Sequence, residues 1–317
     1  MSSQNNPVTA AEFPKEASKS GEFRRQQSAF REWVSADGKS GFKAEPGRYH
    51  LYVSSACPWA HRVIIVRKLK QLEDVIGMTI VDPIRDERGW AFTDEADPLN
   101  GFQFLAEAYQ QSDPAFDGRV TVPVLWDKQT KRILNNESSE ILRMLNSEFD
   151  EWGDGSIDLY PEHQRADIDE LNDLIYENVN NGVYRSGFAT TQSAYEAAIV
   201  PLFDVLEELE KRLADRRYLM GGTITEADWR LFTTLVRFDA VYHGHFKCNL
   251  KRIADFPNLW AYLRDLYQVP GVAETVNFDH INRHYYVTHR AINPTGVVPI
   301  GPELNFMEPH GRGGVIQ

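Results

Sequence analysis

The first half of the chain combines short apolar runs with longer amphipathic ones. Residues 49–54 (YHLYVS) are aromatic and β-branched, which predicts a strand, and a helix with a mixed apolar face is expected over about 58–72. A second short strand is expected at 78–81, so the chain opens with a β-α-β unit. Residues 120–126 (VTVPVLW) predict a further strand, in which the proline indicates a break in the ladder or an edge position.

Weaker patterns complete this half. A helix is expected within 102–110, a partner strand around 133–134, and another helix over 138–145. Residues 1–44 are polar and carry little periodic apolar pattern, so we expect an extended arm with a short helix at 28–34.

The pattern becomes helical after about residue 150. Apolar residues recur at spacings of three and four, which predicts helices over 164–180, 193–213, 225–238 and 257–267. The last residues are rich in glycine and proline and are expected to be irregular. The sequence therefore predicts an α/β domain followed by an all-α domain. The expected boundaries are an N-terminal extension at 1–44, the α/β domain at 45–150, the helical domain at 151–292 and a tail at 293–317.

Composition narrows the possible functions. The 317 residues include 34 Lys and Arg against 46 Asp and Glu, a net charge of −12, which disfavours binding to nucleic acid or to an anionic membrane. No apolar run is long enough for a membrane span, and the first residues lack the apolar core of a secretory signal. Two cysteines cannot form a disulfide framework or a four-cysteine zinc site, and they favour a reducing compartment such as the cytoplasm.

One cysteine lies where its chemistry would be altered. Cys57 falls between the first strand and the first long helix, and Pro58 is suited to the first helical position. The partial positive charge at a helix start favours a thiolate. Ala60 stands where a second cysteine would resolve a disulfide, so an external thiol is required. Cys248 has no such setting and is expected to be structural.

Three short motifs together resemble a glutathione transferase with a thioredoxin-like domain and a helical domain. They are Cys57-Pro58-Trp59-Ala60, Val122-Pro123 and Glu137-Ser138. The resemblance implies a cis bond before Pro123. Ser138 could also serve simply as a helix N-cap. The segment Thr225–Asp228 fits the capping motif of that superfamily, which we assign to folding.

Longer segments narrow the resemblance to the glutathionyl-hydroquinone reductases, the xi class of these transferases. They are SSACPWAHR at 54–62, GRVTVPVLW at 118–126, NVNNGVYRSGFA at 178–189, residues 238–248 and TVNFDHINRHY at 275–285. The similarity runs from about residue 22 to the C-terminus. It implies a homodimer, and glutathione and a glutathionyl-hydroquinone as the small-molecule partners.

The resemblance also implies the site residues. Cys57 would be the nucleophile, and Tyr184 and Tyr285 would face the quinol ring. The residues implied to hold glutathione are Trp90, Val122, Pro123, Glu137 and Ser138. Trp90 could instead be a core aromatic, and His284 and His289 could suggest a metal site, although we expect no metal.

The implied reaction has two steps. The Cys57 thiolate takes the glutathionyl sulfur from the quinol, and a second glutathione then releases glutathione disulfide. The alternatives are an omega-like thiol transferase or dehydroascorbate reductase that uses the same cysteine, and a non-catalytic transferase-fold module. The sequence does not specify the physiological quinol.

Overall fold

The computed structural model describes Glu16, residues 18–93 and residues 96–314. Its contacts group the chain into two units. Unit 1 contains Gln26–Ile157 and Asn277–Arg290, and unit 2 contains the described parts of Lys15–Arg25, Asp158–Val276 and Ala291–Gln317. The domain boundaries expected from the sequence stay a prediction.

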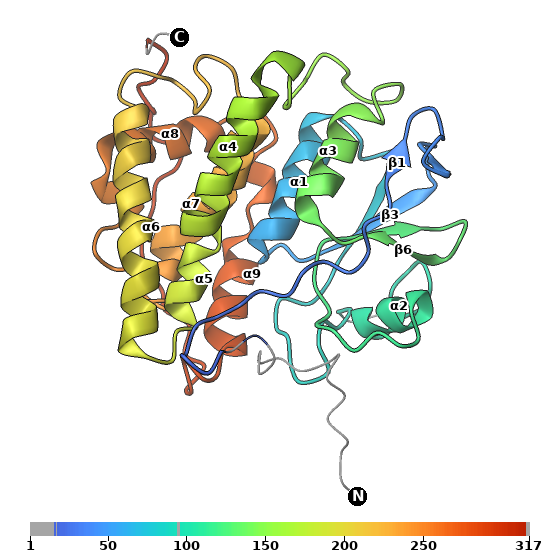
Figure 1. Cartoon of the computed structure of the whole chain (residues 1–317), viewed down its shortest axis with the longest axis horizontal. Helices are drawn as coiled ribbons and strands as arrows, with labels where there is room; N and C mark the ends of the chain where they lie inside the picture. Colours follow the sequence, from blue (N-terminus) through green and yellow to red (C-terminus); the bar gives the residue numbers. More distant parts are fainter. Residues whose placement is uncertain (1–15, 17, 94–95, 315–317) are drawn as a thin grey trace, which may run out of the picture. The chain divides into compact units, whose positions relative to one another are not determined.

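Unit 1 is an α/β unit built on a four-stranded sheet in the order β4-β3-β5-β6 (Figure 1). Strand β3 pairs parallel with β4 and antiparallel with β5, and β5 pairs antiparallel with β6. Helices α1 and α3 pack against each other, and α2 packs against β6. The expected β-α-β opening is confirmed. The bounds are β1 Val34–Ser35, β2 Phe42–Lys43, β3 Tyr49–Val53, α1 Pro58–Leu69, β4 Gly77–Ile80, α2 Leu105–Ser112, β5 Val124–Asp127, β6 Arg132–Asn135 and α3 Ser138–Ser147.

The proline of the apolar run lies before its strand rather than inside it. The Val122–Pro123 bond is cis, as the resemblance implied, and β5 begins at Val124. Strand β5 then pairs on both sides, so the expectation of a break is confirmed and that of an edge strand is wrong. Pro123 has no N–H to contribute to a ladder, and the ladder starts after it.

The helix expected at 28–34 is wrong. This part of the arm is extended and leads into β1, which pairs with β2. Its backbone donors bond to the segment around β6 instead of to their own chain four residues back. The Phe30 N–H donates to Asn136 Oδ1, and the Glu32 N–H donates to the Leu134 carbonyl. These N–H groups therefore bond to acceptors on distant segments, in place of the backbone carbonyls that a helix would offer.

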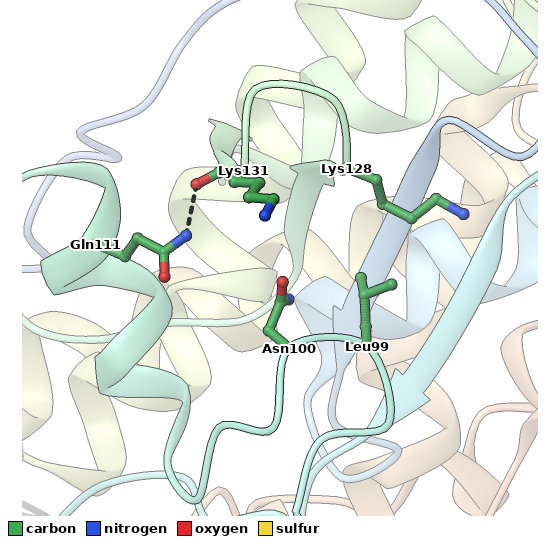
Figure 2. A pocket seen from close by; sticks show the side chains of 5 residues that line it. All are labelled: Leu99, Asn100, Gln111, Lys128 and Lys131. Atoms are coloured by element: carbon green, nitrogen blue, oxygen red, sulfur yellow. Dashed lines mark hydrogen bonds between the residues drawn. The ribbon is translucent and has the colours of Figure 1, made fainter.

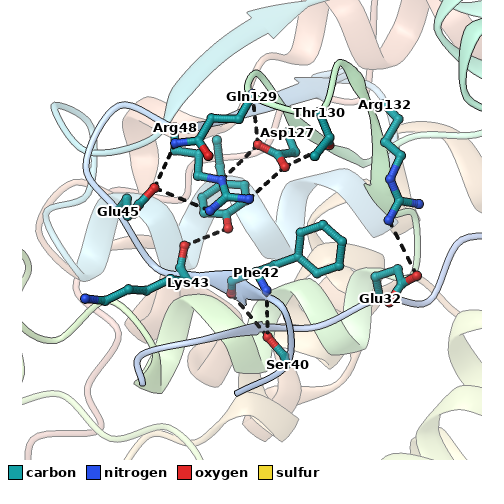
Figure 3. Close-up of polar contacts among 11 residues, drawn as sticks. Glu32, Ser40, Phe42, Lys43, Glu45, Arg48, Asp127, Gln129, Thr130 and Arg132 are labelled. Atoms are coloured by element: carbon teal, nitrogen blue, oxygen red, sulfur yellow. Dashed lines mark hydrogen bonds and ion pairs between the residues drawn. The ribbon is translucent and has the colours of Figure 1, made fainter. Parts of the chain in front are cut away.

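A buried ion pair lies at the end of the sheet where the inner strand β3 begins and its neighbour β5 ends (Figure 3). Arg48 forms a two-point contact with the fully buried carboxylate of Asp127, at 3.0 and 2.9 Å. The Gln129 N–H and the Thr130 hydroxyl donate to the same carboxylate. Burial raises the pKa of Asp127, but these donors and the Arg48 charge outweigh it, so the pKa falls below its usual value. The hairpin between β5 and β6 is held by this cluster.

Unit 2 is helical, as expected from the periodicity (Figure 1). Helix α5 packs on α6, α4 packs on α7, and α8 contacts both α6 and α7. The described tail contains turns but no helix or strand. The bounds are η3 Glu162–Gln164, α4 Arg165–Ile175, η4 Tyr176–Asn180, α5 Gly182–Gly187, α6 Gln192–Arg212, α7 Glu226–Arg237, η5 Phe238–Tyr242, η6 Ile253–Asp255, α8 Pro257–Tyr267 and η7 Ala273–Thr275. Two later elements, α9 Phe278–Arg283 and η8 His284–Thr288, belong to unit 1.

The start of α7 is held by a buried carboxylate. Asp228 Oδ2 accepts from the Thr225 N–H at 2.8 Å and from the Thr225 hydroxyl at 3.1 Å. Its Oδ1 accepts from the Leu219 N–H and the Tyr262 hydroxyl, each at 2.9 Å. The expected bond from Asp228 back to Thr225 is confirmed, and the motif ties α7 to α8.

Replacing Thr225 with Val should destabilise the fold by about 1–2 kcal/mol, because a buried carboxylate loses one hydroxyl donor while the shape is kept. Chemical denaturation of the purified protein would measure it. Thr225→Ser keeps the hydroxyl and loses only one buried methyl group, so it should cost less than the Val variant, about 0.8 kcal/mol. Equal stability of the Val and Ser variants would contradict the role of this hydroxyl.

Candidate active site

Cys57 is the N-cap residue of α1, and Pro58 is the first residue of that helix. The Cys57 carbonyl accepts from the His61 N–H at 3.0 Å, so the turn after β3 leads directly into the helix. The first turn of α1 carries no acidic residue. The thiol, which is partly exposed, therefore lies at the positive end of the helix dipole.

The cis-proline loop lies beside this thiol. Cys57 Sγ donates to the Val122 carbonyl at 3.6 Å, although the two residues lie far apart in sequence. The structure thus brings together Cys57, Val122 and Pro123, three of the residues singled out in the sequence.

Glu137, rather than Ser138, is the N-cap of α3. Its carboxylate accepts from the Ser139 N–H at 3.2 Å, and from the hydroxyls of Ser139 and Ser28, both at 2.9 Å. The suggestion that Ser138 serves simply as the N-cap is therefore wrong; Ser138 is the buried first residue of the helix. The longer carboxylate side chain folds back to reach the N–H two residues on.

The Glu137 carboxylate stays charged to low pH. Burial raises its pKa, but the Ser139 and Ser28 donors and the positive charge of Arg62 outweigh burial and hold the pKa below its ordinary value. The Arg62 guanidinium also lies 4.5 Å from the Trp59 ring centroid. Glu137 can therefore offer a negative charge to a cationic group such as an amino-acid ammonium.

The lowered pKa of Glu137 predicts how the stability of the protein changes with pH. A carboxyl group whose folded pKa is lowered adds stability above its unfolded pKa, near 4.5, and loses it as the pH falls through the folded value. Wild type should exceed Glu137→Gln by about 1–2 kcal/mol from pH 5 to 8, and the gap should close below pH 4.5. Denaturation at each pH would measure it. The exposed Glu151→Gln serves as the control and should show no gap; a Glu137 gap that widens on acidification would contradict this sign.

The side chain of His284 lies between those of Trp90 and Tyr285 and contacts both rings. The sequence motifs did not assign a catalytic role to this histidine. The His284 ring stacks on Trp90 with centroids 5.1 Å apart and planes at 16°, and it meets the Tyr285 ring edge-on at 5.3 Å. His284 Nδ1 lies 2.6 Å from the Pro83 carbonyl, so this nitrogen carries a proton and donates. That bond fixes the orientation of the ring between the two aromatic residues.

The Trp90 indole N–H is a candidate ligand contact. Trp90 is 4% exposed, and among the described residues its Nε1 has no hydrogen-bond acceptor. A buried donor of this kind is uncommon without a partner, and a carbonyl of a bound peptide could supply one. The core packing of Trp90 and its expected contact with glutathione are therefore compatible.

Tyr184 lies in unit 2, on the short helix α5. Its partly buried ring belongs to an aromatic cluster with Phe188, Tyr242 and Phe246, at centroid distances of 5.5–6.1 Å. The Arg25 guanidinium covers the ring at 4.8 Å. Tyr285 belongs to unit 1, so the two expected quinol-facing tyrosines come from different units.

Three π-helical segments, η4, η5 and η8, mark the surroundings of both tyrosines. Segment η8 carries His284 and Tyr285, η4 ends just before Tyr184, and η5 carries Tyr242 of the Tyr184 cluster. Such widened turns are rare and recur at functional sites. Helical periodicity alone does not distinguish them from an ordinary helix, so the amino-acid sequence does not reveal them.

A cavity of about 380 Å³ lies away from these residues (Figure 2). It is lined by Leu99, Asn100, Gln111, Lys128 and Lys131. Lys128 follows Asp127, which pairs with the first residue of β3, whereas Cys57 follows the end of β3. The cavity therefore opens at the opposite end of the sheet and contains none of the expected site residues.

Three other possibilities raised by the sequence concern Cys248, a metal site and a membrane span. Cys248 is fully buried, and burial raises the pKa of its thiol well above the usual range, which fits the expected structural thiol. Over the described residues, no three His, Cys, Asp or Glu side chains are arranged to hold a metal ion. Within the same residues, no helix has the length and apolar character that crossing a membrane requires.

Comparison with known proteins places this site in a family. Models of the glutathione S-transferase N-terminal and C-terminal domains match residues 56–148 and 192–265. The chain is 54% identical over 303 residues to glutathionyl-hydroquinone reductase YqjG of Escherichia coli, covering 92% of each protein. The chain belongs to the glutathionyl-hydroquinone reductases, the xi class of glutathione transferases. Reductase PcpF of Sphingobium chlorophenolicum is also 54% identical, over 90% of this chain and 91% of that protein.

Solved structures of related glutathione transferases share the fold. The glutathione-bound structure of YqjG matches with a TM-score of 0.87, covering 89% of this chain and 96% of that one. The xi transferase of Phanerochaete chrysosporium is 52% identical, with a TM-score of 0.89 and coverage of 93% and 97%. The expected fold, a thioredoxin-like domain followed by a helical domain, is confirmed for this xi-class reductase.

Proposed function

We propose that this protein reduces glutathionyl-hydroquinones to hydroquinones with glutathione. The observation that carries the proposal is the Cys57 thiol at the start of α1 beside the cis-proline loop, in a chain 54% identical to two reductases of that name. The glutathione bound in the YqjG structure supports glutathione as the co-substrate.

The first step breaks a carbon–sulfur bond, and an aryl carbanion is a poor leaving group. The substrate therefore first takes a keto form, protonated at the sulfur-bearing carbon. The Cys57 thiolate attacks the sulfur, an S–S bond forms, and the C–S electron pair leaves as an enolate. Tyr184 and Tyr285 would move that proton and stabilise the oxyanion.

The second step restores the enzyme. The thiolate of a second glutathione attacks the glutathionyl sulfur of the mixed disulfide, which releases glutathione disulfide and the Cys57 thiolate. The net reaction converts one thioether and one glutathione into one hydroquinone and one disulfide. Because a cysteine stands where other transferases activate glutathione, little conjugation to electrophiles is expected.

Binding of glutathione is assigned to unit 1. Val122 and Pro123 would pair with the cysteinyl backbone, while Glu137 and Ser138, at the start of α3, would hold the charged γ-glutamyl end. The ionised state of Glu137 and the buried Trp90 N–H support this placement.

The decisive experiment mixes the protein with glutathionyl-menadiol and excess glutathione and follows quinol release by chromatography. Rapid release is expected, together with no turnover of an S-alkyl glutathione, which cannot form the keto tautomer. Exchange with hydroxyethyl disulfide but no quinol release would instead indicate an omega-like thiol transferase. Inactivity toward both substrates would indicate a non-catalytic module.

We also propose that the protein acts as a homodimer in the cytoplasm. The family resemblance supports the dimer, and the two thiols support a reducing compartment. Light scattering coupled to gel filtration should give twice the chain mass of 36.3 kDa. A mass of one chain at micromolar concentration would refute the dimer.

A further inference from the structure

The N-terminal arm reaches Tyr184. Its segment Ser18–Arg25 belongs to unit 2 and runs beside α5, where Figure 1 draws it in dark blue. At its end, the Arg25 guanidinium carbon lies 4.8 Å from the centroid of the Tyr184 ring. Arg25 Nε also donates to Asn181 Oδ1 at 3.1 Å, and Asn181 is the buried N-cap residue of α5.

The arm is held there by contacts that do not involve Arg25. The Thr190 N–H donates to the Gly21 carbonyl at 3.0 Å, and the Thr191 hydroxyl donates to the Ser20 carbonyl at 2.9 Å. The Phe23 ring packs on Phe188 with centroids 5.3 Å apart. A change at Arg25 alone should therefore leave the arm in place.

Gly21 makes this close approach possible. Its φ is +86°, in the region that favours glycine, and a Cβ there would lie 2.7 Å from side-chain atoms of Thr190 and Thr191. The arm is thus fitted to the surface next to α5.

We propose that Arg25 is a positioning residue for Tyr184 that makes its phenol a better proton donor. A guanidinium over an aromatic face is attracted to the ring and stabilises the phenolate relative to the phenol. The bond to Asn181 ties this charge to the same short helix that carries Tyr184. The catalytic meaning rests on the proposed function, in which Tyr184 moves a proton during quinol release.

Several other titratable groups lie near Tyr184. Glu177 of η4 forms an ion pair with Arg185 at 2.6 Å, and Glu196 of α6 accepts from Gln192. Burial lowers the pKa of His245, which stacks on Phe246, to about 4. The ring of Tyr242 lies 5.9 Å away, and the buried thiol of Cys248 is neutral. Lys247, next to Phe246 of the aromatic cluster, carries a positive charge that acts on His245 and Cys248. Arg25 thus supplies the positive charge over the ring.

The test compares Arg25→Gln with Arg25→Lys and with a matched control, Arg24→Gln. Arg24 is the adjacent arginine of the arm, and it is exposed and paired with Glu22. Each protein is labelled with fluorotyrosine, and the Tyr184 fluorine signal is assigned by its loss in Tyr184→Phe. The pH midpoint at which this signal titrates should rise by about one pH unit in Arg25→Gln and by less in Arg25→Lys. It should not change in Arg24→Gln.

Kinetics supply the second readout. Arg25→Gln should slow release from glutathionyl-menadiol about tenfold while changing exchange with hydroxyethyl disulfide less than about twofold. Lysine should restore part of the rate. An unchanged Tyr184 titration, or equal slowing with both substrates, would overturn the proposal. The titration needs no turnover, so it decides the Arg25–Tyr184 coupling even if the wild type releases no quinol, a result that would overturn the proposed function itself.

Discussion

Replacing Cys57 with Ser is expected to reduce quinol release from glutathionyl-menadiol at least about 1,000-fold. A serine hydroxyl at the start of α1 is not ionised near pH 7 and cannot form a disulfide with the glutathionyl sulfur. Both steps of the proposed cycle pass through that disulfide, so neither can proceed. Initial rates measured by chromatography would give the loss directly.

Intact mass supplies the chemical proof. Wild type incubated with the thioether and no free glutathione should gain one glutathionyl group and release one equivalent of quinol. Cys57→Ser should gain none. Adding glutathione afterwards should remove the group from wild type, because the chain places no second cysteine next to Cys57 to resolve the disulfide.

The chain offers its own matched control. Cys248 is the other cysteine, and it is fully buried with a neutral thiol. Cys248→Ala should keep the adduct and most of the activity. An adduct that disappears in Cys248→Ala, or quinol release that survives in Cys57→Ser, would contradict the assignment of the nucleophile.

Local signals in the sequence were sufficient to place Cys57 and the loop beside it. A strand, a cysteine and a proline at a helix start are adjacent along the chain, so Cys57 could be placed without any tertiary contact. The cis-proline loop was located by a proline in an apolar run, and the structure puts its Val122 carbonyl next to the thiol. Features of this kind depend on neighbours in sequence, which periodicity and turn chemistry reveal.

Contacts between distant segments were not predictable in the same way. Residues 28–34 do not form the expected helix, because N–H groups such as that of Phe30 donate hydrogen bonds to residues beside β6. His284 stacks on Trp90 only because the chain returns to unit 1 after the helical unit. Arg25 reaches Tyr184 through an arm with no periodic pattern. None of these pairings leaves a local trace in composition or spacing.

Tyr184→Phe and Tyr285→Phe should each slow quinol release about 100-fold while changing exchange with hydroxyethyl disulfide less than about threefold. The two substrates share the Cys57 attack and differ in the leaving group. A disulfide expels a thiolate, which needs no proton on carbon. The thioether expels carbon, which leaves readily only after the ring is protonated at that position.

The structure gives the two tyrosines different settings for this task. Tyr285 is 1% exposed and meets His284 edge-on, so its ring is held by packing. Tyr184 is partly buried beneath the Arg25 guanidinium. Tyr286→Phe, at the residue next to Tyr285, removes a hydroxyl from the same π-helical segment and is the matched control. It should retain wild-type rates with both substrates.

Steady-state constants and solvent isotope effects would show which step of the reaction the Tyr→Phe variants slow. In the tyrosine variants, kcat for the thioether should fall with little change in KM, because the hydroxyl acts while charge develops rather than in binding the ground state. Solvent deuterium should slow wild-type quinol release more than disulfide exchange, since a proton moves to carbon in the first reaction alone. Equal slowing of both substrates by either Tyr→Phe change would show that the tyrosine supports Cys57 or the fold, and the proton-transfer role would then have to be assigned elsewhere.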